Sequence, residues 1–194
     1  DYNFQMAQRI YIRATDSPED YFLTAAMMQR AVDADPENYG AWTYWGFAEA
    51  GSAMLLSGVP EVQLQFVRKS LDRFVAAHSL YPQSASISAN IARTLDGLRR
   101  FDEAEESWKK ALAWGDGSRL IHWWYADHLF AMGRYEEALE HYWPALHKHK
   151  LGGMKRQKIQ EGIERCQKAL EAIRKRNAGQ APVPVPASVP APPQ

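Results

Sequence analysis

The chain has 194 residues, of which 46% are hydrophobic, so it is long enough to bury one core or to form one short array of repeats. Lys plus Arg and Asp plus Glu both number 23, and this balance gives no overall basic field of the kind that binds nucleic acid. Residues 148–176 contain 10 basic and 3 acidic side chains, so a basic C-terminal segment follows an acidic body.

The single cysteine, Cys166, excludes an internal disulfide and a cysteine-rich zinc site, and we expect it to be a small buried apolar residue. The apolar runs are too short and too often interrupted to span a membrane. Because the chain begins with Asp1 and not Met, we expect a processed product or a part of a longer chain. This start and the Pro-rich C-terminal composition favour a bacterial periplasmic setting but do not determine the compartment.

The middle of the chain repeats with a period of 34 residues. The segment FDEAEESWKKAL at 101–112 aligns with YEEALEHYWPAL at 135–146, and the same shift backwards gives Ser70, Phe74 and Ala77. Upstream, the equivalent Ala and Pro positions are 46 residues apart, which indicates an insertion of 12 residues within GSAMLLSGVPEV.

These residues resemble the tetratricopeptide repeat, a pair of helices with Trp, Leu, Gly and Tyr on the first and Ala, an aromatic, Ala and a closing Pro on the second. WTYWG at 42–46 carries the first pattern, FVAAHSLYP at 74–82 carries the second, and MGRYEEAL at 132–139 matches the family's turn. The resemblance implies an all-α, right-handed superhelical solenoid of antiparallel helix pairs. We expect pairs at 5–38, 39–84 with the insertion, 85–118 and 119–152, then a capping helix at 153–177 and a tail at 178–194.

The residues themselves explain why such pairs stack. Small residues such as Ala104 and Ala138 let two helix backbones approach closely, while the aromatic between them fills the neighbouring gap. Each pair leaves an apolar face that the next pair must cover, which predicts a solenoid. The first repeat departs from the pattern, with Thr24 and Met28 where Ala and an aromatic are expected.

Two further departures fall within the repeats. The insertion has no strand signal and contains a helix start at Pro60, so we expect extra turns on both helices of the second repeat. Its residues Met54, Leu55 and Leu56 form either an apolar lip or a surface that packs on the longer partner helix. Pro144 removes one hydrogen bond from the last repeat's second helix and predicts a kink near 141–143.

The C-terminal part of the sequence predicts one amphipathic helix, which lies in the basic segment, followed by an irregular tail. Its apolar residues recur at alternating steps of four and three, at Ile159, Ile163, Cys166, Leu170 and Ile173. We expect a helix that covers the last face of the array, with a membrane-surface helix or a coiled coil as alternatives. The tail contains six prolines and almost no large side chains, which predicts disorder or polyproline II.

A concave groove is the expected binding surface. In HWWYADHLF at 122–130, one face of a helix carries the core residues His122, Tyr125, Ala126 and Leu129. Another face carries Trp123, Asp127 and Phe130, with Trp124 at its border. The register of the repeats also places Asp96 in the groove. The candidate groove residues are Arg9, Arg13, Tyr44, Phe47, Asn90, Arg93, Trp123, Trp124, Asp127 and Phe130. Alternatively, the C-terminal helix or the insertion covers these aromatics.

Some members of the family bind C-terminal carboxylates with a clamp of Lys, Asn and Arg side chains. Asn90 matches the clamp's central Asn, but Thr43, Phe47, Leu120 and Trp124 occupy the other clamp positions. We therefore expect a different mode of binding. The tail is long enough to reach the chain's own groove or a neighbour's, and polyproline II segments bind aromatic-lined grooves.

The expected function is that of a protein-interaction adaptor or scaffold, without catalysis, metal or cofactor. The six histidines, including His147 and His149, match no metal-ligand spacing, and no Gly-rich phosphate loop is present. The alternatives are a chaperone for secreted or membrane subunits and a fixed structural subunit of a membrane-associated complex. RNA binding is disfavoured because the groove lacks a continuous basic stripe. The sequence determines neither the partner nor the oligomeric state.

Overall fold

The structure is a computed structural model that describes residues 2–13, 18–56, 58–115, 118–147 and 153–179. Over these ranges the chain forms helices and no strand. The predicted tail lies outside the described residues from position 180 onwards. The helices are α1 (Tyr2–Arg13), α2 (Pro18–Ala34), α3 (Tyr39–Leu55), α4 (Pro60–Leu80), α5 (Ala85–Gly97), α6 (Phe101–Gly115), α7 (Arg119–Ala131), α8 (Tyr135–His147) and α9 (Gly153–Gly179).

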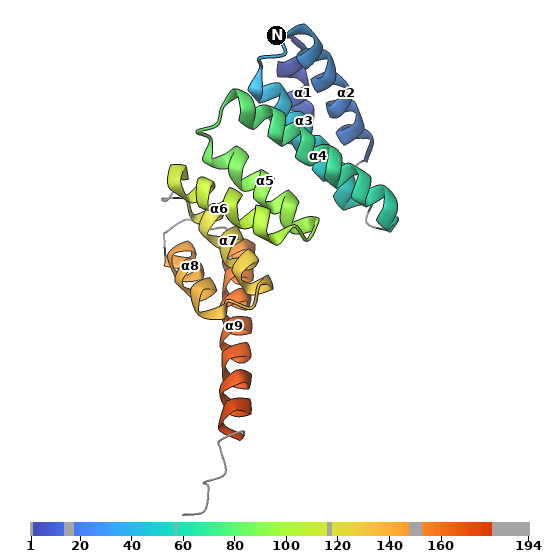
Figure 1. Cartoon of the computed structure of the whole chain (residues 1–194). Coiled ribbons are helices and arrows are strands. Elements are labelled where there is room, and N and C mark those ends of the chain that lie inside the picture. Colours follow the sequence, from blue (N-terminus) through green and yellow to red (C-terminus); the bar gives the residue numbers. More distant parts are fainter. Residues whose placement is uncertain (1, 14–17, 57, 116–117, 148–152, 180–194) are drawn as a thin grey trace, which may run out of the picture.

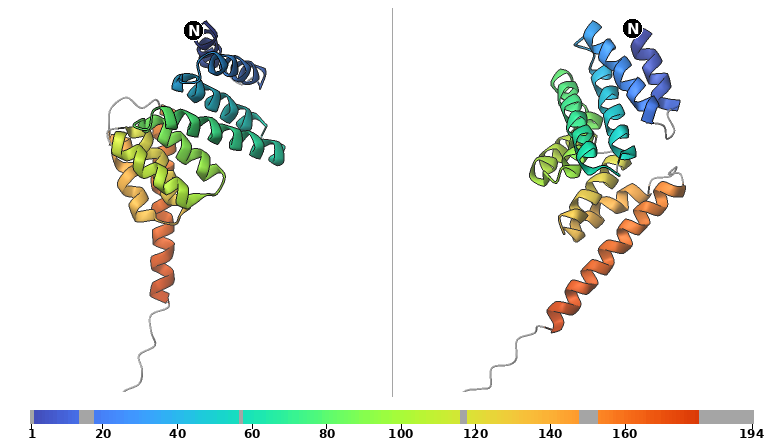
Figure 2. Two further views of the ribbon diagram at one scale, coloured as in Figure 1. Left: turned by 45° about the horizontal axis from the view of Figure 1, so that its top comes forward. Right: turned by 90° about the vertical axis from the view of Figure 1, so that its right-hand side faces the viewer.

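The helices form antiparallel pairs that stack into a solenoid, which confirms the predicted all-α solenoid (Figure 1; Figure 2). Within the pairs, α1 packs on α2, α3 on α4, α5 on α6 and α7 on α8. Contacts of α2 with α3, α4 with α5 and α6 with α7 join successive pairs. Helix α8 continues through Pro144 to its end at His147.

The period of 34 residues is visible as equivalent packing in the core. Side chains 34 positions apart are completely buried at Ala104 and Ala138, Trp108 and Tyr142, and Ala111 and Ala145. The polar tips of the two large aromatics reach the preceding helix, because Trp108 Nε1 donates to Asp96 over 2.9 Å and the Tyr142 hydroxyl donates to Asp127. In α6 and α8 this aromatic thereby makes both an apolar contact and one hydrogen bond.

The second pair is longer than those that follow it. Helices α3 and α4 have 17 and 21 residues, whereas α5 and α7 have 13 each, so the inserted residues extend both partners. The two long helices approach closely at Gly46, where an added Cβ would lie 2.7 Å from the ring of Phe74. Ser70 strengthens this approach by donating its hydroxyl to the Gly46 carbonyl over 3.0 Å.

Helix α9 covers the end of the array with its N-terminal half only. Ile159, Ile163 and Cys166 are buried against α8 and α7, whereas Leu170 and Ile173 are half-exposed. Figure 2 shows the C-terminal half of this helix extending beyond the other helices. The predicted apolar stripe therefore continues past the surface that it caps.

Two turns of the repeat have the same backbone geometry but different residues at the strained position. Arg99 after α5 and Gly133 after α7 have positive φ angles of 57° and 75°. In both turns the next residue donates its backbone N–H to the carbonyl five positions earlier, over 3.0 and 2.9 Å, which is the Schellman arrangement. Glycine adopts this conformation freely, whereas a side chain at Arg99 is strained there.

We expect Arg99→Gly to raise the free energy of unfolding by about 0.5–1 kcal/mol, because relief of the left-handed strain exceeds the extra entropy of glycine in the unfolded chain. The matched change Gly133→Ala should lower it by about 1 kcal/mol. Urea unfolding monitored by far-ultraviolet circular dichroism measures the free energy of unfolding of both variants. A loss of stability in Arg99→Gly would show that the Arg99 side chain contributes more than its backbone strain costs.

A buried histidine joins the third helix pair to the fourth. The side chain of His128 on α7 is completely buried, with Nδ1 2.6 Å from Asp96 of α5 and Nε2 2.9 Å from Glu105 of α6. Glu105 also accepts from the Tyr125 hydroxyl over 2.9 Å and pairs with Arg134 over 3.1 Å. Because ionised carboxylates only accept hydrogen bonds, both ring nitrogens must carry a proton for both contacts to form.

Burial alone would lower the pKa of His128, but its hydrogen bonds and charge interactions with Asp96, and then with Glu105, raise that pKa above its usual value. A group with a raised folded pKa stabilises the fold fully below its unfolded pKa, here about 6.5, and loses that contribution as the pH rises through the folded value. The stabilisation from His128 is therefore strongest under mildly acidic conditions.

We expect the free energy of unfolding to fall as the pH rises above about 6.5, through the raised pKa of His128. Urea titrations of the unmodified chain and of His128→Gln over this range measure the effect, and the variant should lose the slope. His78→Gln is the matched control, because burial and Lys110 lower the pKa of His78. An unchanged slope in His128→Gln would contradict the assignment.

Candidate protein-binding groove

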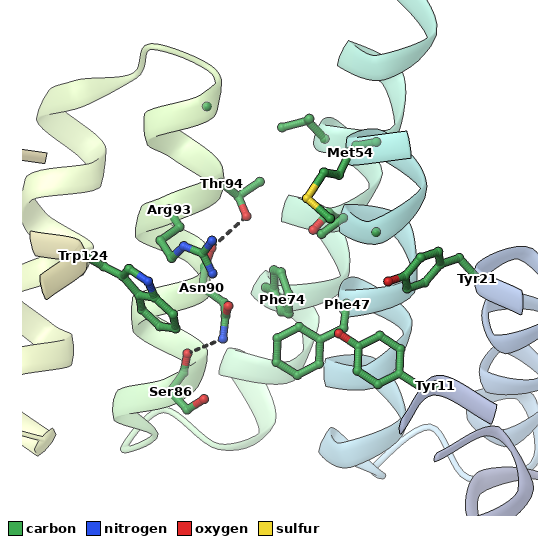
Figure 3. A pocket seen from close by; sticks show the side chains of 16 residues that line it. Tyr11, Tyr21, Phe47, Met54, Phe74, Ser86, Asn90, Arg93, Thr94 and Trp124 are labelled. Atoms are coloured by element: carbon green, nitrogen blue, oxygen red, sulfur yellow. Dashed lines mark hydrogen bonds between the residues drawn. The ribbon is translucent and has the colours of Figure 1, made fainter. Parts of the chain in front are cut away.

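The inner face of the solenoid is hollowed between α3 and α5. This first hollow has a volume of about 450 Å³, and α1, α2, α4 and α7 also contribute to its wall (Figure 3). Among the described residues that line it, Arg93 is the only charged one. The side chains that shape it include Tyr11, Tyr21, Phe47, Met54, Phe74, Asn90, Arg93 and Trp124. Five aromatic side chains thus line the hollow beside small and polar residues and one cation.

Aromatic contacts that bridge three helices build one wall of the first hollow. The rings of Tyr11 on α1 and Phe47 on α3 are stacked, with centroids 5.8 Å apart, and Phe47 meets Phe74 of α4 edge-on at 5.3 Å. Burial, followed by the neighbouring Tyr21 and Tyr44, raises the pKa of Tyr11. The hydroxyl of Tyr11 therefore stays protonated at neutral pH and can donate a hydrogen bond.

Arg93 and Trp124 form the opposite wall. The Arg93 guanidinium carbon lies 4.2 Å from the centroid of a Trp124 ring, a cation–π contact between α5 and α7. Asn90, one turn before Arg93, donates its side-chain amide to the carbonyl of Ser86 over 2.8 Å, which fixes the amide's orientation. The rings of Tyr11 and Phe47 on one wall thus face the Trp124 ring on the other, and the N–H donors of Arg93 lie at the edge of the hollow.

A second hollow continues the surface from α5 and α7 to α9. It has a volume of about 740 Å³ and shares Arg93 and Trp124 with the first hollow, so the two form one continuous depression, here called the groove. Trp123 and Lys158 line its far end, and both also line a further hollow of about 470 Å³ between α7 and α9. Unlike the first hollow, the second carries charged groups of both signs.

Asp127 lies in the second hollow and is half-buried. Burial raises the pKa of its carboxyl, and the hydrogen bond from the Tyr142 hydroxyl opposes that rise. Because the carboxylate already accepts this hydrogen bond from the core of the fourth pair, Asp127 holds α7 against α8. We therefore regard it as a structural part of the groove floor.

The structure brings six of the ten predicted groove residues into the two hollows: Phe47, Asn90, Arg93, Trp123, Trp124 and Asp127. Tyr44 and Phe130 lie outside them, since Tyr44 packs edge-on against Phe4 and Tyr11, and Phe130 packs on Tyr135. Arg9 is exposed but lines neither hollow, and the side chain of Arg13 lies outside the described part. Six predicted residues therefore share one surface, and the rest do not.

The two adjacent tryptophans are both half-buried and both line the second hollow. Their neighbour Tyr125 takes the core position, with 6% of its surface exposed. Helix α9 borders Trp123 through Lys158 and Arg165 but leaves it partly exposed, so the cap covers this aromatic only in part.

The three residues of the predicted apolar lip differ in how far they are exposed. Met54 is 67% exposed and lines the first hollow, whereas Leu55 and Leu56 are half-buried. Only Met54 therefore adds an exposed apolar side chain to the edge of the groove.

The sequence does not predict Tyr11, Tyr21 or Lys158 as groove residues. Tyr11 and Tyr21 line the first hollow in place of Arg9 and Arg13, because the first repeat lacks the Trp and Gly positions that would fix its register. Lys158 was assigned with the rest of α9 to a capping role, and no local signal indicates that it turns towards Trp123.

The described residues contain no group of three or more His, Cys, Asp or Glu side chains placed to hold a metal ion. None of the described helices has the length and apolar character needed to cross a membrane.

No protein-family model matches the sequence, and a comparison with curated proteins finds no match. Among solved structures, BtubC (BKLC) from P. vanneervenii matches 100% of this chain and 94% of its own, with 15% identity and a TM-score of 0.54. A MamA structure matches over 81% and 92%, with 15% identity and a TM-score of 0.51.

A thermophilic TPR protein of Thermus thermophilus matches over 87% of this chain and 97% of its own, with 19% identity and a TM-score of 0.46. One MamA variant is covered over 64% of its own length and 63% of this chain, with 24% identity and a TM-score of 0.48. The two likenesses with TM-scores above 0.5 show a shared fold. With its repeat motifs and stacked helix pairs, the chain has a tetratricopeptide-like helical repeat fold.

Proposed function

We propose that the protein is an interaction scaffold that binds a segment of a partner protein along the groove. The observation that carries the proposal is the continuous depression on α3, α5 and α7, with Arg93 and Trp124 where its two hollows meet. Aromatic and arginine side chains are the usual energetic anchors of protein interfaces. A partner segment that crosses this junction contacts the stacked pair and both hollows.

The two hollows favour different parts of such a segment. The first is aromatic with one cation, so it suits apolar side chains and main-chain carbonyls that accept hydrogen bonds from Arg93. The second presents Arg99 and Lys158 beside Asp96 and Asp127, so it suits polar groups. This division gives a bound segment a preferred direction.

A fixed structural subunit of a larger, membrane-associated complex is the second candidate. The half-exposed Leu170 and Ile173 on the extending part of α9, together with the adjacent basic Arg174 and Lys175, favour it. In that role the protein would be held through α9 as well as through the groove. A chaperone for secreted or membrane subunits would instead bind several clients in the groove.

The substitution Arg93→Glu tests the groove. It replaces the exposed cation beside Trp124 with an anion and leaves the buried core unchanged. We expect the affinity for a partner captured from source cells to fall about tenfold or more, as it does when an interface anchor is lost. Arg68→Glu, at an exposed position of α4 that lines neither hollow, should bind like the unmodified chain.

Both variants must first show the same helicity and unfolding midpoint as the unmodified chain. Equal loss of affinity in both would indicate a general charge effect. Full retention in Arg93→Glu would exclude the groove and direct attention to α9. One captured partner supports a scaffold, whereas many partners with the same sensitivity support a chaperone.

A further inference from the structure

We infer that the first hollow binds the Pro-rich segment 180–194 of a second copy of this chain, in a polyproline II conformation. This inference rests on the proposed function, because it names the partner of the same groove. The segment reads QAPVPVPASVPAPPQ and contains six prolines and no charged side chain. Such a composition favours the extended polyproline II helix, which loses little entropy on binding.

The walls of the first hollow match the side chains of this segment. Proline and valine present flat or branched apolar surfaces without charge, and polyproline II ligands bind between aromatic rings. The hollow offers the stacked rings of Tyr11 and Phe47 on one side and Trp124 on the other. Arg93 is the only charged residue among its described lining, so an uncharged ligand meets no anionic side chain there and can accept hydrogen bonds from Arg93 through its carbonyls.

The hydrogen-bonding groups of the groove are also complementary. Proline has no backbone N–H, so a Pro-rich segment presents mainly carbonyl acceptors. The guanidinium of Arg93 and the protonated hydroxyl of Tyr11 are donors. Asn90 adds a polar group between them, held in place by Ser86. A ligand rich in acceptors therefore suits the hollow better than an ordinary peptide with alternating donors.

The course of α9 favours a second copy as the source of the segment. Figures 1 and 2 show α9 running away from α1, α2 and α3, and its 27 residues correspond to a length of about 40 Å. The 15 residues of the segment extend over at most about 46 Å in polyproline II. Returning to its own groove would use most of that length, whereas the groove of a neighbouring molecule can approach the end of α9 directly.

If the groove of each molecule binds the segment of the next, the assembly is head-to-tail and keeps growing unless its geometry makes a closed ring. Sedimentation velocity of the full chain should therefore show a mean mass that grows with concentration. A synthetic 180–194 peptide added in excess should return the chain to a monomer. In fluorescence anisotropy, the labelled 180–194 peptide should bind the full chain saturably. An excess of an unlabelled control peptide, in which alanine replaces every proline, should not displace it.

The groove variant for this test is Trp124→Leu, which removes one aromatic wall but keeps an apolar side chain. Trp114→Leu, at a 55% exposed tryptophan of α6 outside the hollows, is the matched control. We expect peptide affinity to fall about tenfold or more in Trp124→Leu and to stay unchanged in Trp114→Leu. Replacing Pro184 and Pro186 by Ala in the peptide should weaken binding by a similar factor.

Several results would overturn the inference. Absence of peptide binding, or binding that Trp124→Leu leaves unchanged, would remove the segment from the groove. Saturable binding by a chain that stays monomeric at every concentration would show that the segment occupies its own groove. If the peptide fails to bind while Arg93→Glu still abolishes capture of another partner, only the inference fails and the proposed function stands.

Discussion

The fold depends on one aromatic side chain in the second helix of each of the last three pairs, which must be buried between two helices. Phe74, Trp108 and Tyr142 recur at 34-residue spacing, and each is at most 1% exposed. For two of these rings a glycine of the neighbouring backbone makes room: a Cβ at Gly46 would meet Phe74 at 2.7 Å, and one at Gly162 of α9 would meet Tyr142 at 2.6 Å. No pair can bury its ring and its small residues alone, so stacking follows from this constraint.

The same constraint determines which charges remain available in the groove. Asp96 and Asp127 accept hydrogen bonds from Trp108 and Tyr142, so the acidic groups of α5 and α7 are tied to the core. Arg93 has no such core partner in the described hydrogen bonds and rests on Trp124 at the surface. Burial of the aromatics thereby leaves an exposed cation above a partly exposed ring, which is the arrangement that an interface can use.

The sequence predicts the features that follow from the repeat pattern of a single helix. It does not predict the features that need side chains from helices far apart in the sequence to come into contact. The 34-residue pattern predicts the helix pairs and the core positions of Tyr125, Ala126 and Leu129, because each is a property of one helix face. It does not predict the bonding of His128, whose partners come from α5 and α6. It also misplaces the first repeat in the groove, where Tyr11 stands instead of Arg9, because that helix carries none of the motif residues.

The ends of the groove limit the length of segment that it can hold. At one end, Tyr21 and Met54 close the first hollow, where the added turns of α3 pack beside α2. At the other end, α9 borders the surface at Lys158, so the helix that caps the core also bounds the groove. The partner segment proposed above would lie between these two borders, so they set how much of it the groove can contact.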